Sequence, residues 1–553
     1  MKKIQIIYIL ILTTVFFSCR KDFLEEKPLD FLSPENAFVT YEDFNASVNN
    51  LYYLVRREYF NRDDLRTMDF LFGTDIIYDG EPNTNRHTNM IAAYDPTSTI
   101  PTTHWNLLYK TVSEANTVIT RLPDSELTAE QKVDIEAKAK FFRALTYRTL
   151  VYLFGGVPLV VEEVANPKTD FVRASREDVL KQVIEDLKFA TENLKSITQV
   201  RDGEVNQSAA WHLLSEVYLA VSEFQNAADA ADMVINNPAM SLMQARFGSR
   251  ANETPGDVYW DLFRRNNQNR SSGNREAIWV MQFETNVLGG GSETNSFFGT
   301  FPLERVHPPL IRDVRINGVS PFRWPTGDYT GGRGIGWGIS TLYFSDTIWQ
   351  SDFNNDIRNA NHNFVRDYVA NNPNTPYYGQ IISTKNPPPG VRVPSRSFYA
   401  YQTKATTPFN HPDELYADKS TFLLKSTAGG TYTDQYMFRL AETYLLRAEA
   451  YLGLGDLGKA ANDINTVRSR SKASDVSASQ VNLDYILDER MRELGIEEKR
   501  RLTLMRLGVL YNRVMKCNPY YRSEMLEKYN LWPIPAAEIE RNHENPLQQN
   551  PGY

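Results

Sequence analysis

The side chains that most often perform catalysis or hold metals occur in this chain without the spacing that such chemistry requires. The seven histidines are scattered singly, and none belongs to a His-x-x-x-His or cysteine-containing zinc pattern. The glycine-rich run TGGRGIGWG, residues 330–338, lacks the Gly-Lys-Ser/Thr ending that binds phosphate and magnesium. Glycoside hydrolysis needs two carboxylates across one sugar bond, and no pair stands out among the 68 acidic residues. We therefore predict no metal, no cofactor and no enzymatic activity.

Cys19 has a different chemical context, because it closes an apolar N-terminal segment that follows two lysines. Residues 1–18 have the layout of a secretory signal peptide and are too short for a membrane span, which needs about 20 residues. The small Ser18 directly before Cys19 is typical of a bacterial lipoprotein cleavage site, at which the cysteine sulfur receives a diacylglycerol. Two or more acyl chains hold a protein stably on a bilayer. A secretory peptide with an incidental cysteine is the alternative, and the other cysteine, Cys517, is interpreted as a packing residue.

Charge and composition restrict the class of partner. The net charge is −8 and no long block of one sign occurs, which argues against a nucleic-acid partner. The chain contains 30 Tyr, 29 Phe and 8 Trp, and aromatic rings outside the core serve as flat platforms for sugar rings and peptide side chains.

The elements that would position such side chains are helices. The run YLLRAEAYLGLGDLGKAANDINTVRSR, residues 444–470, has the spacing of a tetratricopeptide helix hairpin, and residues 211–238 are a second copy. Ser175 and Asp178 form a start signal for a further helix. We therefore predict a mostly α fold of tetratricopeptide-like repeats at about 40–238 and 433–515, within a single domain at 19–553.

Between the repeats lies a segment of different composition, at about 239–432. It is rich in Gly, Pro, Asn and aromatic residues, and it is predicted to be a large irregular loop-rich insertion with short strands. After it, DERMRELGIEEKRR, residues 488–501, is interpreted as a structural helix with ion pairs on a solvated face.

Two groups of residues are candidates for ligand contact. One lies in the polar loop DIIYDGEPNTNRHTN, residues 75–89, and the other in the aromatic insertion. A sugar presents an apolar face and a rim of hydroxyls, so its site needs one or two rings together with amide and guanidinium donors. Ordinary loop packing is the alternative interpretation of each residue. The candidates are Tyr78, Asn83, Asn85 and Arg86 in the first group and Trp324, Trp337 and Tyr343 in the second.

Several of these segments together resemble one family, the SusD/RagB-like outer-membrane lipoproteins of Bacteroidetes. The resemblance runs nearly end to end, and Thr503, Met505 and Ile339-Ser340 depart from the family pattern at packing positions. The ligand-contact residues of the family cannot be transferred by motif. The segments that carry the resemblance are CRKDFLEEKP, AKAKFFRALTYRTLVYLFGGVPLV, GWGISTLYFSD, YLLRAEAYLGLGD, DERMRELGIEEKRRLTLMRLG and the C-terminal motif at about 516–553, which ends LWPIPAAEIERNHENPLQQNPGY.

The resemblance implies a SusD-like fold and a nutrient-binding protein held on the cell surface by a lipid anchor in the outer membrane. Its partner would be a SusC-like TonB-dependent transporter, to which it would deliver an oligosaccharide for import. Peptide cargo is an alternative within the same role, and a surface glycosidase or a tetratricopeptide scaffold are the alternatives outside it.

Overall fold

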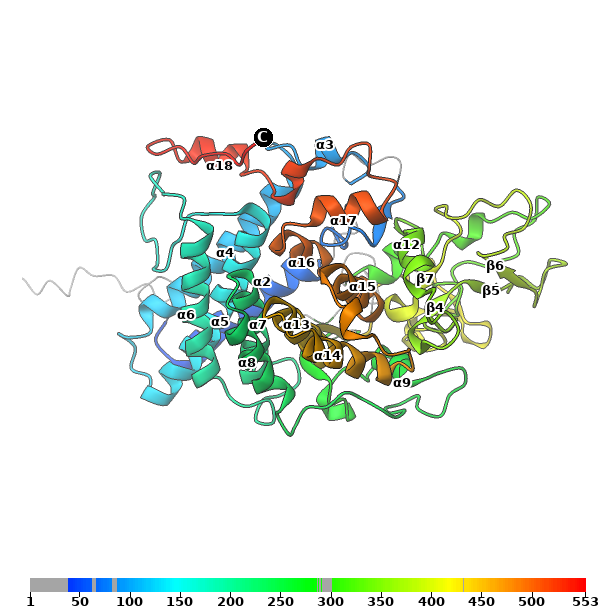
Figure 1. The fold of residues 1–553 in the computed structure, drawn as a ribbon, viewed down its shortest axis with the longest axis horizontal. Helices are drawn as coiled ribbons and strands as arrows, with labels where there is room; N and C mark the ends of the chain where they lie inside the picture. Colours follow the sequence, from blue (N-terminus) through cyan, green and yellow to red (C-terminus); the bar gives the residue numbers. More distant parts are fainter. Residues whose placement is uncertain are drawn as a thin grey trace, which may run out of the picture.

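The fold is an array of antiparallel helix pairs with a loop-rich lobe at one end (Figure 1). The computed structural model describes residues 38–61, 66–81, 87–285, 287, 290, 301–430 and 432–553. The long helices are α2 (Tyr41–Tyr59), α4 (Thr99–Arg121), α5 (Ala129–Phe154), α6 (Arg176–Asn193), α7 (Gln207–Ala220), α8 (Phe224–Ile235), α13 (Leu440–Gly453), α14 (Leu457–Arg470) and α15 (Leu483–Glu493). Shorter helices are α3 (Met90–Ala93), α9 (Val258–Leu262), α11 (Leu303–Val306), α12 (Leu342–Ser345), α16 (Arg500–Arg506), α17 (Leu510–Cys517) and α18 (Ala536–Arg541).

Each long helix packs against the next one in the array, from α2 through α8 and then on to α13 and α14. The mostly α, repeat-built fold predicted from the sequence is therefore confirmed. The predicted start signal is also present, because the Ser175 side chain accepts a hydrogen bond from the Asp178 backbone N–H at 3.0 Å and caps α6. Helix α5 is buried on all sides over its C-terminal half, so it forms the centre of the array.

The junction of α8 with α13 joins segments that are far apart in the sequence. Gly453 ends α13 directly against the Phe224 ring at the start of α8, and a Cβ at Gly453 would lie 2.4 Å from that ring. One helix away, His212 of α7 and Thr443 of α13 share a hydrogen bond of 2.8 Å. The chain between α8 and α13 therefore leaves the array and returns to it.

That intervening chain holds most of the short strands, all of which pair antiparallel in two-stranded sheets among the described residues. The hairpin of β5 and β6 reaches the tip of the lobe (Figure 1). The pairs are β1 (Ile77–Asp79) with β3 (Gly338–Ser340), β2 (Ala277–Met281) with β10 (Gln435–Arg439), β4 (Phe364–Val365) with β7 (Tyr401–Gln402), β5 (Asp367–Val369) with β6 (Ile381–Ser383), and β8 (Tyr416–Asp418) with β9 (Leu423–Leu424).

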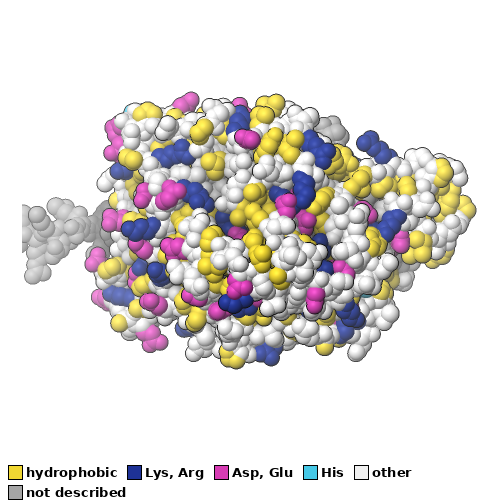
Figure 2. Space-filling model, viewed as in Figure 1, with side chains coloured by type: hydrophobic (Ala, Val, Ile, Leu, Met, Phe, Trp, Pro, Cys, Tyr) yellow, Lys and Arg dark blue, Asp and Glu magenta, His cyan; other side chains and the backbone are white. Residues whose placement is uncertain are grey.

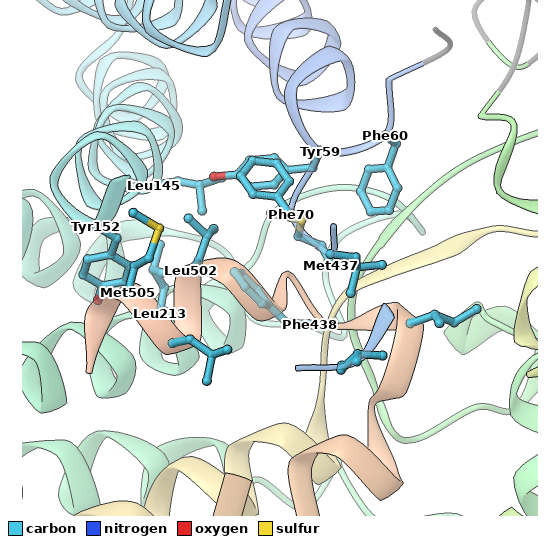
Figure 3. Close-up of a cluster of buried hydrophobic side chains, with 14 of the residues drawn as sticks. Tyr59, Phe60, Phe70, Leu145, Tyr152, Leu213, Met437, Phe438, Leu502 and Met505 are labelled. Carbon is cyan, nitrogen blue, oxygen red and sulfur yellow. The ribbon is translucent and has the colours of Figure 1, made fainter. Parts of the chain in front are cut away.

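One hydrophobic core joins the helical array to the lobe. In its centre, Tyr59 and Phe60 at the end of α2 lie beside Leu145 of α5, Phe438 of β10 and Leu502 of α16 (Figure 3). Because these side chains come from four segments spread over the whole sequence, the core can form only when the array and the lobe assemble together.

The charged helix in residues 488–501 is structural and forms ion pairs as predicted, but the face that carries them is buried, so the prediction of a solvated face was wrong. Glu489 and Glu493 of α15 are both fully buried. Glu493 pairs with Arg358 of the lobe at 3.0 Å and with Arg439 of β10 at 2.6 Å, and Arg470 of α14 also binds it. The sequence shows the alternating charges of α15, but their partners come from distant segments. This network fastens the lobe to α14, α15 and β10.

The surface carries both signs of charge. In the view of Figure 2, Lys and Arg side chains are interspersed with Asp and Glu over the face, and hydrophobic side chains gather at the lobe tip. Val369, Tyr378 and Ile381 of the β5–β6 hairpin are exposed there. No helix in the described part of the chain has the length and apolar character needed to cross a membrane.

Candidate ligand-binding face

The pairing of β1 with β3 brings one residue of each predicted group of ligand-contact residues, Tyr78 and Trp337, onto adjacent segments. Tyr78 of β1 is opposite Ile339 of β3, and the Gly80 backbone N–H donates to the Trp337 carbonyl at 2.7 Å. The Trp337 N–H in turn donates to the Val306 carbonyl at 3.1 Å. Two segments separated by some 250 residues in sequence are therefore joined by backbone hydrogen bonds. These bonds place Tyr78 and Trp337 on neighbouring segments of the chain.

Buried ion pairs of Asp75 hold the segment that leads into β1. The Asp75 carboxylate receives two hydrogen bonds from Arg500, at 2.9 and 2.7 Å, and one from Arg513 at 2.9 Å. Burial alone would raise the pKa of this carboxyl, but Arg500 and Arg513 outweigh burial and hold the pKa at about 2. The Asn518 amide donates to the carbonyls of Thr74 and Ile77. Residues 74–77 are therefore tied to α16 and α17.

Trp324 is half-buried, and two guanidinium groups lie near its ring. Its indole N–H donates to the Gly334 carbonyl at 3.0 Å, which fixes the ring on the loop of residues 330–336. The Arg312 guanidinium carbon lies 4.3 Å from the ring centroid and that of Arg333 lies 5.5 Å from it. Both distances are within the range of cation–π attraction.

Trp337 is also half-buried, and the Arg305 guanidinium lies 5.8 Å from its ring centroid. Arg305 and Arg333 both line the backbone at Gly429, where a Cβ would meet each of them within 3.5 Å. The Arg396 side chain donates to the Ile335 carbonyl at 2.8 Å on the same loop. The two tryptophans are therefore linked through a set of arginines, and we call Trp324, Trp337, Arg305, Arg312, Arg333 and Arg396 the Trp–Arg face.

Tyr78 is not an exposed stacking surface as predicted, because the Tyr520 ring covers it. Its ring is 9% exposed and stacks on Tyr520, with 3.6 Å between ring centroids and an interplanar angle of 15°. Tyr520 is 38% exposed, so it presents the outer ring of this stacked pair. Sequence reasoning missed Tyr520, because it lies in the C-terminal segment and no local pattern relates it to Tyr78.

Tyr343 is attached to other elements than the two tryptophans. Its hydroxyl donates to the Asp488 carboxylate of α15 at 2.8 Å, and Arg513 and Lys516 of α17 lie 5.7 Å from its ring. These contacts hold α12 against α15 and α17. The remaining predicted residues, Cys19, Asn83, Asn85 and Arg86, lie outside the described residues.

A cavity of about 360 Å³ lies in the helical array, away from these residues. It is bounded by α4, by residues 158–171 and by the C-terminal segment, and its walls include Trp105, Tyr109, Val160 and Leu547. Of the predicted ligand-contact residues that the structure describes, Tyr78, Trp324, Trp337 and Tyr343, none lines it.

Two buried titratable groups among the described residues, His104 and Cys517, have structural surroundings. His104 is buried between Glu58, at 2.5 Å, and Asp69, at 3.2 Å. Burial raises the pKa of the Cys517 thiol to about 12, so this thiol is not a nucleophile at neutral pH. Within the described ranges, no group of three or more His, Cys, Asp or Glu side chains has the arrangement of a metal site.

Known proteins with similar sequences and folds are described as SusD-family or SusD-like proteins. The model of the SusD family matches residues 275–553, and a second one, described as starch-binding associating with outer membrane, matches residues 22–219. A SusD-like protein of Formosa agariphila is 25% identical over 98% of this chain and 97% of its own length. The starch-binding protein SusD of Bacteroides thetaiotaomicron is 36% identical over 135 residues, which are 23% of this chain and 24% of that protein. A solved structure of a laminarin-binding SusD-like protein has a TM-score of 0.66 at 21% identity and covers 93% of this chain and 100% of its own.

The family match spans half of the chain, the Formosa agariphila relative aligns with 98% of its length, and the laminarin-binding SusD-like structure has a similar fold over 93% of it. The chain therefore belongs to the SusD family.

Proposed function

We propose that this protein is a surface-exposed lipoprotein of the outer membrane that captures an oligosaccharide on the Trp–Arg face. It would then deliver the sugar to a SusC-like TonB-dependent transporter for import. The observation that carries this proposal is the pair of half-buried tryptophans, each fixed on a loop and each with a guanidinium group over its ring.

The chemistry of the Trp–Arg face suits a sugar ring. An indole ring can stack on the C–H face of a pyranose, while guanidinium N–H groups donate to the hydroxyls at its rim. Trp337 is anchored by backbone hydrogen bonds with Gly80 and Val306, and the Trp324 indole is anchored by its hydrogen bond to the Gly334 carbonyl, so little conformational entropy would be lost when a ligand binds. Binding residues on loops held by a rigid scaffold are a common arrangement.

The names of the relatives support a sugar as the ligand. One curated relative is named as starch-binding and one solved structure as laminarin-binding, and both names describe carbohydrate binding. We propose the same for this chain, with Tyr78 and Tyr520 as a further stacking surface beside the Trp–Arg face.

The membrane anchor is a separate part of the proposal. Cys19 would carry the lipid, and the segment between Cys19 and Phe38 would connect it to the first helix of the array. Replacing Cys19 by Ala should move the protein from the membrane fraction to the soluble fraction of cells that lack the transporter. Continued membrane association of this variant would contradict the anchor.

Binding is tested by isothermal titration of a soluble protein that begins at Arg20, against a panel of oligosaccharides and oligopeptides. We expect saccharide binding that weakens at least tenfold in Trp324→Ala and in Trp337→Ala, because each ring contributes about 1.4 kcal/mol or more of stacking. Tyr53→Ala, an exposed aromatic of α2, is the matched control and should bind as the parent does. Binding of peptides alone, or unchanged saccharide affinity in both tryptophan variants, would refute the proposal.

A further inference from the structure

The cavity of about 360 Å³ in the helical array, here called the array cavity, offers mainly apolar surface to an occupant. On its inner wall the Tyr109 hydroxyl donates to the Pro158 carbonyl at 2.7 Å, and the Asn116 amide donates to the Val160 carbonyl at 2.9 Å. These polar groups are bound within the wall, and the Trp105 ring beside them is only 3% exposed. A cavity of this kind selects an apolar group.

Charged side chains line the outer part of the array cavity. Lys168 and Arg541 are exposed, and each pairs with a carboxylate close by in sequence, Lys168 with Asp170 at 3.3 Å and Arg541 with Glu538. The charges at the mouth are therefore balanced by their own neighbours, and they give no preference for a charged ligand.

The described chain begins beside this cavity. The ring of Phe38, its first residue, lies 5.0 Å from the Arg121 guanidinium at the end of α4. Arg121 in turn donates to the Glu163 carboxylate at 2.8 Å. Glu163 lies between Glu162 and Val164 in sequence, and both of these line the array cavity. The chain that precedes Phe38 therefore joins the array next to one wall of the cavity.

That preceding chain, residues 20–37, lies outside the described residues and has an apolar composition for a connecting segment. Segments that only bridge two bodies through water are usually rich in Gly, Ser, Pro and charged residues. Five of these eighteen residues are instead large and apolar, namely Phe23, Leu24, Leu29, Phe31 and Leu32. Side chains of this type favour a place where they can be buried.

Phe31 is close enough in sequence to reach the array cavity from Phe38. Seven residues of extended chain span up to about 23 Å. Tyr109, on the cavity wall, precedes Arg121 by twelve residues, which is about 18 Å along α4. An apolar cavity of about 150 Å³ holds a benzene ring, so the array cavity has room for a phenyl ring together with the side chain of Leu29.

We propose that the array cavity is the docking site of residues 20–37 of this chain, with the Phe31 ring inserted against α4. The docking itself does not depend on the ligand of the Trp–Arg face. Its consequence for the anchor rests on the proposed lipidation of Cys19. With Phe31 held on the array, only the residues between Cys19 and Phe31 remain as a tether, so the array is held closer to the membrane than the whole segment would allow.

A loop of another protein and a small apolar molecule are the other occupants that the array cavity could take. The chain's own segment is favoured because it is covalently joined to the array beside the cavity wall. A short tether gives its apolar side chains an effective concentration on the order of millimolar at the cavity. A free partner would have to compete with that concentration.

The first test compares hydrogen exchange in the protein that begins at Arg20 and in its Phe31→Asp variant. The described hydrophobic core does not contain residue 31, so the substitution leaves that core intact. We expect protected amides of residues 158–171 to exchange at least fivefold faster in Phe31→Asp. Phe23→Asp, which changes an aromatic residue of the same segment outside the proposed contact, should alter these rates less than twofold. Unchanged rates in Phe31→Asp, or equal acceleration in both variants, would overturn the docking.

The second test supplies residues 20–37 as a separate labelled peptide and measures its binding by fluorescence anisotropy. The peptide should bind the Phe31→Asp protein at least tenfold more tightly than the parent, because the parent's own segment competes for the cavity. Adding Val164→Asp to that variant should weaken peptide binding at least tenfold, since Val164 lines the cavity. Adding Val172→Asp, at an exposed position that does not line it, is the matched control and should change binding less than twofold.

The outcomes are separate from those that test the proposed function, because neither experiment contains a saccharide or a lipid. Equal affinity of the peptide for the parent and for Phe31→Asp would overturn docking of the chain's own segment and leave the array cavity to another polypeptide. Peptide binding that is unaffected by Val164→Asp would place the segment elsewhere and also overturn the proposal. Failure of the peptide to bind either protein at millimolar concentration would do the same.

Discussion

Asp75 offers the sharpest test of how the candidate face is held in place. Its carboxylate is buried and receives three hydrogen bonds from Arg500 and Arg513, and the segment that contains it leads directly into β1 and Tyr78. In Asp75→Asn the two buried guanidinium groups would lose the carboxylate that they share, and Arg500 would keep only Glu498 while Arg513 would keep Asp484 and Asp488. Breaking a buried pair from one side costs about 3–5 kcal/mol, and the retained amide oxygen places the expected loss near 3 kcal/mol.

The pH dependence of this loss can be derived from the pKa of Asp75. A carboxyl with a pKa of about 2 in the folded protein and about 3.9 in the unfolded chain contributes about 2.6 kcal/mol at neutral pH. Because the folded pKa is the lower one, this stability is present above about pH 4 and is lost as the pH falls towards 2. The penalty of Asp75→Asn should therefore be smaller at pH 3 than at pH 7, by about 1 kcal/mol.

The assay is urea unfolding of the parent protein and of Asp75→Asn, followed by tryptophan fluorescence at both pH values. Asp475→Asn, at an exposed position, is the control and should change the free energy of unfolding by less than about 0.5 kcal/mol. A penalty below about 1 kcal/mol at pH 7, or the same penalty at both pH values, would refute the reasoning.

Three further predictions concern the array and its junction with the lobe. For His104, burial alone would lower the pKa, but Glu58 and Asp69 raise it above the ordinary value, so its stabilisation is complete below about pH 6.5 and is lost as the pH rises through the raised pKa. His104→Gln should therefore lower the melting temperature more at pH 5.5 than at pH 9, and equal losses would contradict this. Gly453→Ala should cost about 1–3 kcal/mol in urea unfolding through the clash with Phe224, and Phe224→Leu should recover part of that loss, whereas no recovery would rule out the clash. Glu493→Gln should cost about 3–5 kcal/mol by the same measurement, because three buried arginines share that carboxylate, and a loss like that of an exposed glutamate would exclude this role.

The helical repeats could be predicted because their signals are local. The apolar spacing and small residues of residues 444–470 produce α13 and α14, and Ser175 caps α6 as its sequence position indicates. Each of these signals depends on residues within one or two helical turns, so no knowledge of the remaining chain is needed.

The environment of α15 and of the tyrosines could not be predicted in the same way. The charges of α15 look like those of a solvated helix, and only Arg358, Arg439 and Arg470 from distant segments show that the helix is buried. Tyr520 covers Tyr78 across 442 residues of sequence. For the Trp–Arg face the sequence indicated the rings but not the arginines, since Arg305 and Arg396 approach the face from segments that no periodicity relates to it.

The same distant contacts explain how a loop-rich lobe can present a defined binding face. Residues 301–337 contain little regular secondary structure, so helix or sheet hydrogen bonds alone cannot fix Trp324 and Trp337. Their positions depend on β1, which is tied to α16 and α17 through Asp75, and on the lobe, which is tied to α15 through Arg358 and Glu493. A buried ion pair contributes little net stability but allows few alternative geometries, because each displaced charge would lose its partner in a medium of low polarity. The charges beneath the face therefore set its shape.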